Sequence, residues 1–149
     1  MGAYEYVVTP DNDGIVYVKD GGMGNGSSWN EAGELSVALY FAKPDPSIKQ
    51  VWAVQGAYIP VLVPYGNSNS DPRDRTFVLE DGISVYGGFL GNENSISQRP
   101  QGARSLLSGW VTPSDRAYHV VIANNNKKST LLDGFTISDG EFRVSYLFD

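Results

Sequence analysis

Cysteine is absent from the 149-residue chain, and histidine occurs only once. The first absence excludes thiolate nucleophiles, disulfides and cysteine-ligated zinc or iron–sulfur centres. The second excludes a metal site that needs several histidines of one chain. We therefore expect no metal and no cofactor, and the composition assigns no catalytic residue.

Basic residues are few, with 11 Lys and Arg against 17 Asp and Glu and a net charge of −6. A broad positive surface for nucleic acid or for an anionic membrane needs the opposite balance. No apolar run approaches the roughly 20 residues of a membrane-spanning helix, and residues 1–4 lack the basic and apolar pattern of a signal peptide. We expect no nucleic-acid partner and no membrane insertion, while a cytosolic protein and a mature secreted one both remain open.

Glycine and aromatic residues are abundant, with 17 Gly, 9 Tyr and 6 Phe, and only 19% of residues are charged. This composition predicts a turn-rich β protein rather than a helical bundle. Residues 4–9 and 15–18 flank an Asp/Gly turn, which predicts a hairpin or two adjacent edge strands. From residue 50 onward, short apolar runs separated by turn formers predict further strands at 51–54, 76–79, 83–86, 106–107, 119–122, 131–132 and 135–137.

One helix is predicted near the N-terminus. Ser28 is a good N-cap and Glu31 follows three residues later, which completes a capping box. Pro44 ends the pattern, so the predicted span is Trp29 to Lys43. The apolar residues of this span fall on one helical face, and they are Ala32, Leu35, Leu39 and Ala42.

A weak repeat is present in the second half of the chain. An aliphatic residue, a small or polar residue, glycine and then an aromatic residue recur with a period in the low twenties. The three copies are Val85-Tyr86-Gly87-Gly88-Phe89, Leu107-Ser108-Gly109-Trp110 and Leu132-Asp133-Gly134-Phe135. This spacing predicts a parallel β-solenoid, and a β-sandwich with coincidental turn spacing is the alternative.

Several motifs in order carry a resemblance to a known group of proteins. They include Gly26-Ser27-Ser28-Trp29, Val51-Trp52-Ala53-Val54, Thr76-Phe77-Val78-Leu79, Asp81-Gly82, Gly91, Glu93, Arg99 and Phe135-Thr136-Ile137, together with the repeat copies. Residues 15–140 are similar to the N-terminal part of surface proteins common in Bacteroidetes, of the pectin-lyase-like superfamily. The resemblance implies an all-β fold: a short right-handed parallel β-helix of about four coils with one N-terminal capping α-helix. It also implies an extracellular or bacterial cell-surface location.

We expect a single domain spanning residues 1–149. Its predicted parts are N-terminal strands in 1–20, the capping helix in 28–43, the coils in 50–140 and a C-terminal strand or tail in 141–149. The tail alternates apolar and other residues, which is typical of a strand. It can close the domain, pair with the edge of a second copy, or be the end of a piece cut from a longer protein. The candidate self-association residues are Phe142, Val144, Tyr146 and Phe148.

A long, polar loop of mixed charge at residues 65–75 is the predicted ligand surface, because binding residues concentrate on loops. Tyr58, expected to be exposed beside Gly56 and Pro60, can stack on a sugar. The candidate ligand-binding residues are Tyr58, Asp71, Arg73, Asp74 and Arg75, for a glycan or a carboxylate. The alternative is a flexible insertion whose charges compensate one another, with Arg75 in a structural role. Trp52, Tyr86 and Trp110 are further candidates for sugar stacking.

Two other features are interpreted as structural. His119 lies in a predicted strand without an identifiable triad partner, and no Gly-x-Ser-x-Gly motif is present. Asp11, Asp13 and Asp20 partly imitate a calcium loop, but the first position is Thr9 and the flanks are strand-like. A turn with solvated carboxylates explains these residues better.

We expect a non-catalytic cell-surface or secreted scaffold with a role in adhesion or assembly, and its surface location is what the resemblance implies. A glycan or a host or cell-surface protein is the expected partner, and a homo-oligomer can form through the C-terminal end. One alternative is a carbohydrate-binding or polysaccharide-cleaving β-helix, and another is a self-associating structural protein. We expect no enzyme, because no paired-acid motif is present and about four coils offer little groove.

Overall fold

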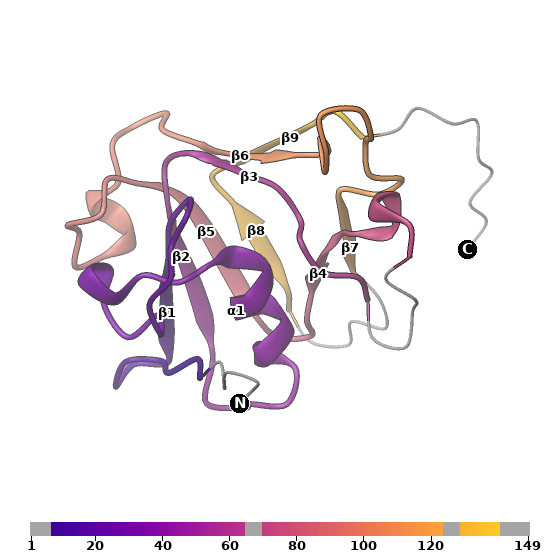
Figure 1. Cartoon of the computed structure of the whole chain (residues 1–149). Coiled ribbons are helices and arrows are strands. Elements are labelled where there is room, and N and C mark those ends of the chain that lie inside the picture. The colour runs from indigo at the N-terminus through magenta and orange to yellow at the C-terminus, as the bar shows by residue number, and fades with distance from the viewer. Residues whose placement is uncertain (1–6, 65–69, 124–128, 141–149) are drawn as a thin grey trace.

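The computed structural model describes residues 7–64, 70–123 and 129–140 (Figure 1). Within these ranges the chain forms one α-helix, α1 (Leu35–Ala42), and three short 3₁₀ helices, η1 (Trp29–Glu31), η2 (Pro72–Asp74) and η3 (Ile96–Gln98). The strands are β1 (Ile15–Val18), β2 (Gln50–Val54), β3 (Ala57–Tyr58), β4 (Phe77–Leu79), β5 (Ser84–Phe89), β6 (Ser105–Ser108), β7 (Val121–Ala123), β8 (Leu131–Asp133) and β9 (Phe135–Ser138).

The described strands form three sheets in which every pair is parallel. The orders are β1-β2-β5-β8, β3-β6-β9 and β4-β7. Figure 1 shows β3, β6 and β9 running together along the top of the view, with α1 beside β1 and β2. The last strand of each sheet in the sequence therefore lies at that sheet's edge.

The predicted fold class, an all-β right-handed parallel β-helix of about four coils, is wrong. The described strands fall into separate parallel sheets of four, three and two strands, and α1 packs against them. The repeat misled the prediction because its copies are not equivalent. Val85 pairs with Leu132 in one sheet, whereas Leu107 pairs with Tyr58 and Ile137 in another.

The core lies between the sheets and α1. Val16, Val51 and Val85 pair in register across β1, β2 and β5, and each is at most 1% exposed. Because side chains alternate along a strand, these valines point to one face and their neighbours to the other. Leu39 of α1 and Phe77 of β4 complete the same cluster. The buried side chains of α1 are therefore part of the same core as those of the strands.

The predicted helix begins six residues too early. Ser28 is an N-cap, since its hydroxyl accepts a 3.3 Å hydrogen bond from the Glu31 amide, but it caps only η1. The α-helix starts at Leu35, with Glu34 as its N-cap. Its end at Ala42, with Lys43 as the C-cap, agrees with the predicted stop.

Main-chain pairing with β1 explains the interruption between η1 and α1. The Gly33 amide donates to the Tyr17 carbonyl at 2.9 Å, and the Lys19 amide donates to the Gly33 carbonyl at 3.0 Å. These bonds hold Gly33 extended beside β1, so it cannot continue a helix. A Cβ on Gly33 would lie 2.9 Å from the Gly24 carbonyl oxygen, which shows how closely the backbones approach.

The predicted N-terminal hairpin is also wrong in the described part of the chain. Val7 and Val8 are not in a strand, and β1 pairs in parallel with β2. The Asp/Gly turn exists, but it leads β1 into a sheet with a distant segment. The turn was therefore predicted correctly, whereas the strand that pairs with β1 was not.

Candidate functional site

A hollow of about 440 Å³ lies between η2 and the segment that leads into β7. We call it the Arg73 hollow. Its lining residues are Pro64, Arg73, Asp74, Thr76, Tyr118, His119 and Ile122. It combines charged, aromatic and apolar groups from segments far apart in the sequence.

Parallel pairing between β4 and β7 brings the two walls together. Phe77 pairs with Val121, and the Phe77 amide donates to the Val120 carbonyl at 2.9 Å. In the segments that precede β4 and β7, the Tyr118 amide donates to the Arg73 carbonyl at 2.9 Å. Main-chain hydrogen bonds therefore join the two walls at two points along the chain.

Asp71 positions Arg73 in two ways. Its carboxylate caps η2 by accepting a 2.9 Å bond from the Arg73 amide, and it also accepts two 3.4 Å bonds from the Arg73 guanidinium. The amide bond first, and the guanidinium second, lower the pKa of the Asp71 carboxyl. The side-chain bond to Asp71 in turn raises the pKa of Arg73. Both groups are therefore charged at neutral pH.

The Arg73 guanidinium lies over the Tyr118 ring, 4.7 Å from its centroid. This cation–π contact and the Asp71 pair hold the side chain in one orientation. The Arg73 side chain is nevertheless 40% exposed, so its remaining N–H groups can meet a ligand. Asp74 and His119 are exposed at the rim of the hollow.

The candidate ligand-binding residues of the loop are only partly brought together. Asp71, Arg73 and Asp74 gather around η2, and Arg73 and Asp74 line the hollow. Arg75 follows as the C-cap of η2, and its Nε is buried without a hydrogen-bond partner among the described residues. Residues 65–69 of the same loop lie outside the described residues.

Tyr58 was expected to be exposed, and this expectation is wrong. Its side chain is 2% exposed, and its hydroxyl donates a 2.7 Å bond to the Val54 carbonyl. The reason is that Ala57 and Tyr58 form β3, which pairs with β6 and turns the ring into the core. The ring has no free face on which a sugar can stack.

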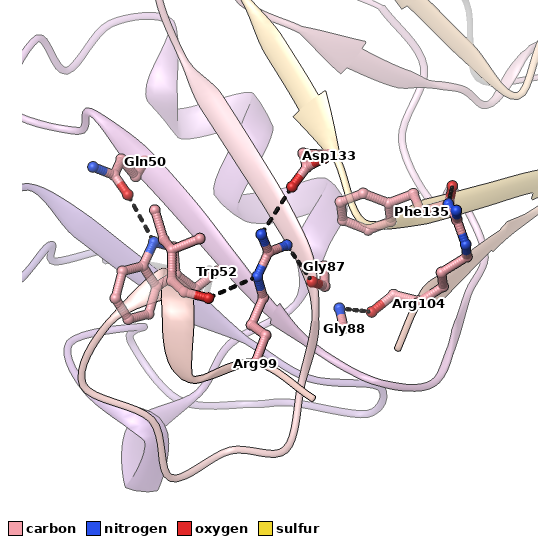
Figure 2. A network of polar contacts seen from close by, with 10 residues as sticks. Gln50, Trp52, Gly87, Gly88, Arg99, Arg104, Asp133 and Phe135 are labelled. Carbon is pink, nitrogen blue, oxygen red and sulfur yellow. Dashed lines mark hydrogen bonds and ion pairs between the residues drawn. The ribbon is translucent and has the colours of Figure 1, made fainter. Parts of the chain in front are cut away.

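Trp52 is likewise unavailable for sugar stacking. It is 4% exposed, stacks on Phe89 with centroids 4.7 Å apart, and donates a 2.7 Å bond to the Gln50 amide oxygen (Figure 2). Tyr86 is half-buried beneath Arg99, whose guanidinium lies 5.4 Å from the ring centroid. Trp110 is 42% exposed and has Arg116 over its ring.

No ligand-binding role was predicted for Tyr118 or His119 from the sequence. His119 was interpreted as structural, yet it is exposed and lines the hollow with Arg73. No local sequence signal links His119 to Arg73, because the two residues come to line the same hollow through the pairing of β4 with β7. A correct prediction of that pairing is the one clue that would have found this wall of the site.

The residues of the partial calcium loop form a hydrogen-bonded turn. One Asp11 carboxylate oxygen accepts from the amides of Asp13 and Ile15, and the other accepts a 2.7 Å bond from the Tyr17 hydroxyl. Burial, and then the hydrogen bond and charge of Asp11, raise the pKa of Tyr17. Across residues 7–64, 70–123 and 129–140, no group of three or more His, Asp or Glu could hold a metal ion.

The predicted self-association residues Phe142, Val144, Tyr146 and Phe148 lie outside the described residues. In the ranges that the structure describes, no helix has the length and apolar character to cross a membrane. Comparisons of the chain with protein-family models, with curated proteins and with solved structures find no match.

Proposed function

We propose that this chain is a non-catalytic adhesion scaffold of the cell surface or the extracellular space, and that it binds a neutral carbohydrate in the Arg73 hollow. The observation that carries the proposal is the placement of Arg73 over Tyr118, beside Asp74 and His119. The surface location depends on the resemblance of residues 15–140 to Bacteroidetes surface proteins.

The lining of the Arg73 hollow suits a polyhydroxylated ligand. Arg73 and His119 offer N–H donors, while the Asp74 carboxylate offers two acceptor oxygens. Pro64 and Ile122 add apolar surface for the C–H faces of a sugar ring. A volume of about 440 Å³ lies within the usual range of small-molecule sites, about 300 to 1,000 Å³.

The charges of this region favour a neutral sugar over an acidic one. Asp71 already pairs with Arg73, and Asp74 adds a second negative charge at the rim. A ligand carboxylate would meet both. Hydroxyl groups can instead accept from the guanidinium and donate to Asp74 without a charge penalty.

The lining also argues for binding rather than cleavage. Glycosidases place two carboxyl groups on either side of the bond that they break. Asp74 is the one carboxylate among the described lining residues of this hollow. We therefore assign it a hydrogen-bonding role and no role as an acid or base.

A glycan array followed by calorimetry tests the proposal. The wild-type chain is expected to bind at least one neutral glycan, and Arg73→Ala and His119→Ala are each expected to weaken that binding about tenfold or more. Arg104→Ala is the matched control, because Arg104 is an exposed arginine outside the hollow. Equal affinity of Arg73→Ala and wild type, or no neutral glycan bound, would overturn the proposal.

A second candidate function, self-association, is favoured by the arrangement of the sheet edges. β7, β8 and β9 each end a sheet, and Leu131 of β8 and Ile137 of β9 are 42% and 49% exposed. At the other end, the Tyr17 amide donates to the Gly26 carbonyl at 2.8 Å, so the β1 edge is already closed. Two copies would then meet through like edges and form a closed dimer.

Light-scattering mass over a concentration series tests this second candidate. Dimers are expected for the wild-type chain and monomers for Ile137→Lys, because a buried lysine opposes edge pairing. Met23→Lys is the control, since Met23 is 88% exposed and lies outside the proposed contact. A wild-type chain that remains monomeric at the highest concentration would contradict self-association.

A further inference from the structure

A second hollow, of about 360 Å³, lies beside η3, and half of its lining residues are polar or charged. We call it the Arg104 hollow. One wall is η3 with the turn of residues 99–104, and the other is Asp133 at the end of β8 and Gly134 between β8 and β9. Its lining includes two arginines and one carboxylate, Arg99, Arg104 and Asp133.

Arg99 is held rigidly at the base of this hollow. Its Nε donates to the Ile96 carbonyl at 3.0 Å, its Nη1 to the Gly87 carbonyl at 3.0 Å, and its Nη2 to an Asp133 carboxylate oxygen at 2.9 Å (Figure 2). The guanidinium also lies over the Phe89 ring, 5.5 Å from the centroid. Binding a ligand would therefore cost little side-chain entropy at this residue.

Donors remain on Arg99 after these bonds are made. A guanidinium has five N–H groups, and the three bonds to described residues use one on each nitrogen. One N–H on Nη1 and one on Nη2 are left. The side chain is 19% exposed, so a small group within the hollow can approach it.

Arg104 supplies most of the unused donors. It is exposed, and among the described residues its guanidinium makes one long bond, 3.4 Å from Nη1 to the Phe135 carbonyl. Figure 2 shows Arg104 beside Phe135, with Gly87 and Gly88 drawn between Arg104 and Arg99. Two guanidinium groups therefore border the same hollow, that of Arg99 with three hydrogen bonds to described residues and that of Arg104 with one long bond.

Asp133 partly satisfies this positive charge. Its side chain is 50% exposed and neutralises only one of the two arginines. The described lining of the hollow thus keeps a net charge of +1, in a chain whose net charge is −6. A planar group with two negative oxygens fits what is left, because a guanidinium binds a carboxylate through two parallel N–H groups.

We propose that the Arg104 hollow binds the carboxylate of a small organic acid. Arg104 makes the main contact, and the spare N–H groups of Arg99 make the second. Glycine at position 134 lets this wall of the hollow approach Arg99 closely, because a Cβ there would lie 2.9 Å from the Arg99 Nη1 atom. This site is separate from the Arg73 hollow and does not depend on the function proposed for it.

Amide and arginine side-chain NMR signals of the full chain provide the test. Sodium acetate, sodium glucuronate and glucose are titrated separately at constant ionic strength, with sodium chloride as the blank. Saturable shifts around residues 96–104 and 133–134 are expected with glucuronate. Shifts with acetate as well identify any carboxylate as the ligand chemistry, whereas shifts with glucuronate alone identify an acidic sugar.

Three variants decide between specific and general electrostatic binding. Arg104→Ala is expected to weaken the carboxylate at least tenfold, and Arg104→Lys to weaken it severalfold because lysine lacks the planar fork. Asp133→Asn is expected to tighten it, because a competing carboxylate is removed. Arg116→Ala is the control and leaves it unchanged, because Arg116 is not among the described residues that line either hollow.

Two results would overturn the inference. One is the absence of saturable shifts at residues 96–104 with both carboxylates, and the other is an equal response of wild type and Arg104→Ala. Neither result bears on neutral glycans at the Arg73 hollow, whose signals come from residues 73 and 118–122. The two proposals can therefore fail separately.

Discussion

The indole Nε1 of Trp29 donates a 2.9 Å hydrogen bond to the main-chain oxygen of Glu93, which joins η1 to the turn that follows β5. Glu93 is itself only 4% exposed. Its carboxylate accepts bonds from the amides of Leu90 at 2.7 Å, Gly91 at 3.0 Å and Asn92 at 3.1 Å. One residue thus holds its own turn and anchors a distant one.

Glu93→Gln tests this role through pH. Burial opposes the charged form, but the backbone amides outweigh it and lower the pKa of the Glu93 carboxyl. A lowered pKa contributes stability that is present above the unfolded value, about 4.3, and is lost as pH falls through the folded value. We expect Glu93→Gln to cost about 1.5 to 3 kcal/mol at pH 7 and less at pH 3, measured by urea denaturation.

The control for Glu93→Gln is Glu31→Gln, because Glu31 is exposed. Its stability is expected to match wild type at both pH values. A Glu93→Gln deficit of the same size at pH 3 and pH 7 would mean that the carboxylate charge does not matter.

Glu34→Gln is expected to act in the opposite direction. Burial is the main cause that raises the pKa of Glu34, although its carboxylate accepts a 2.9 Å bond from the Val37 amide. A raised pKa contributes stability below the unfolded value that is lost as pH rises through the folded value. Glutamine keeps the capping oxygen without the charge, so the variant should be at least as stable as wild type at pH 7.

Thermal unfolding at pH 4 and pH 7 measures this effect. The advantage of Glu34→Gln over wild type should grow from the lower to the higher pH. A variant that loses stability at pH 7 would show that the α1 cap needs a full negative charge.

Gly134→Ala should destabilise the chain by about 2 kcal/mol or more. Gly134 has a φ of 83°, and a Cβ there would lie 2.6 Å from the Gly87 carbonyl oxygen as well as against Arg99. Gly102→Ala is the matched control, since Gly102 has a φ of 78° but nothing within 4 Å of the added Cβ. It should cost only the backbone strain of about 1 to 2 kcal/mol. Equal losses in urea denaturation would exclude the close contact as the cause.

Trp52 and Trp110 should differ sharply in their contribution to stability. Trp52→Ala removes a buried ring stacked on Phe89 and is expected to cost about 3 to 5 kcal/mol. Trp110→Ala affects a ring that is 42% exposed and should cost about 1 kcal/mol or less. Fluorescence-detected urea unfolding measures both, and a small loss for Trp52→Ala would contradict the stacked core.

Local chemistry predicted the elements of this fold better than their partners. Ser28 was correctly recognised as a cap, but its helix ends at Glu31 because Gly33 pairs with β1. The strand predicted at 83–86 corresponds to β5. Its Val85 pairs with Leu132, two copies further along the sequence repeat, and not with Leu107 of the next copy. Pairings between distant strands depend on packing, which short motifs do not encode.

The candidate site shows the same limit. Arg73 was predicted as a ligand-binding residue from its polar loop, and it does line a hollow. Tyr58 was misjudged because flanking Gly56 and Pro60 are typical of an exposed turn, whereas β3 pairing buries the ring. Tyr118 and His119 line the Arg73 hollow because β7 pairs with β4.

The ascending strand order of each sheet has a consequence for biosynthesis. In β1-β2-β5-β8, β3-β6-β9 and β4-β7, every strand after the first adds to one that precedes it in the chain. A nascent chain can therefore dock each strand as it leaves the ribosome, without waiting for residues still to be translated. The edge of an earlier strand is then unpaired only until the next strand of its sheet is made, and among the described strands β7, β8 and β9 keep an edge at the end of their sheets.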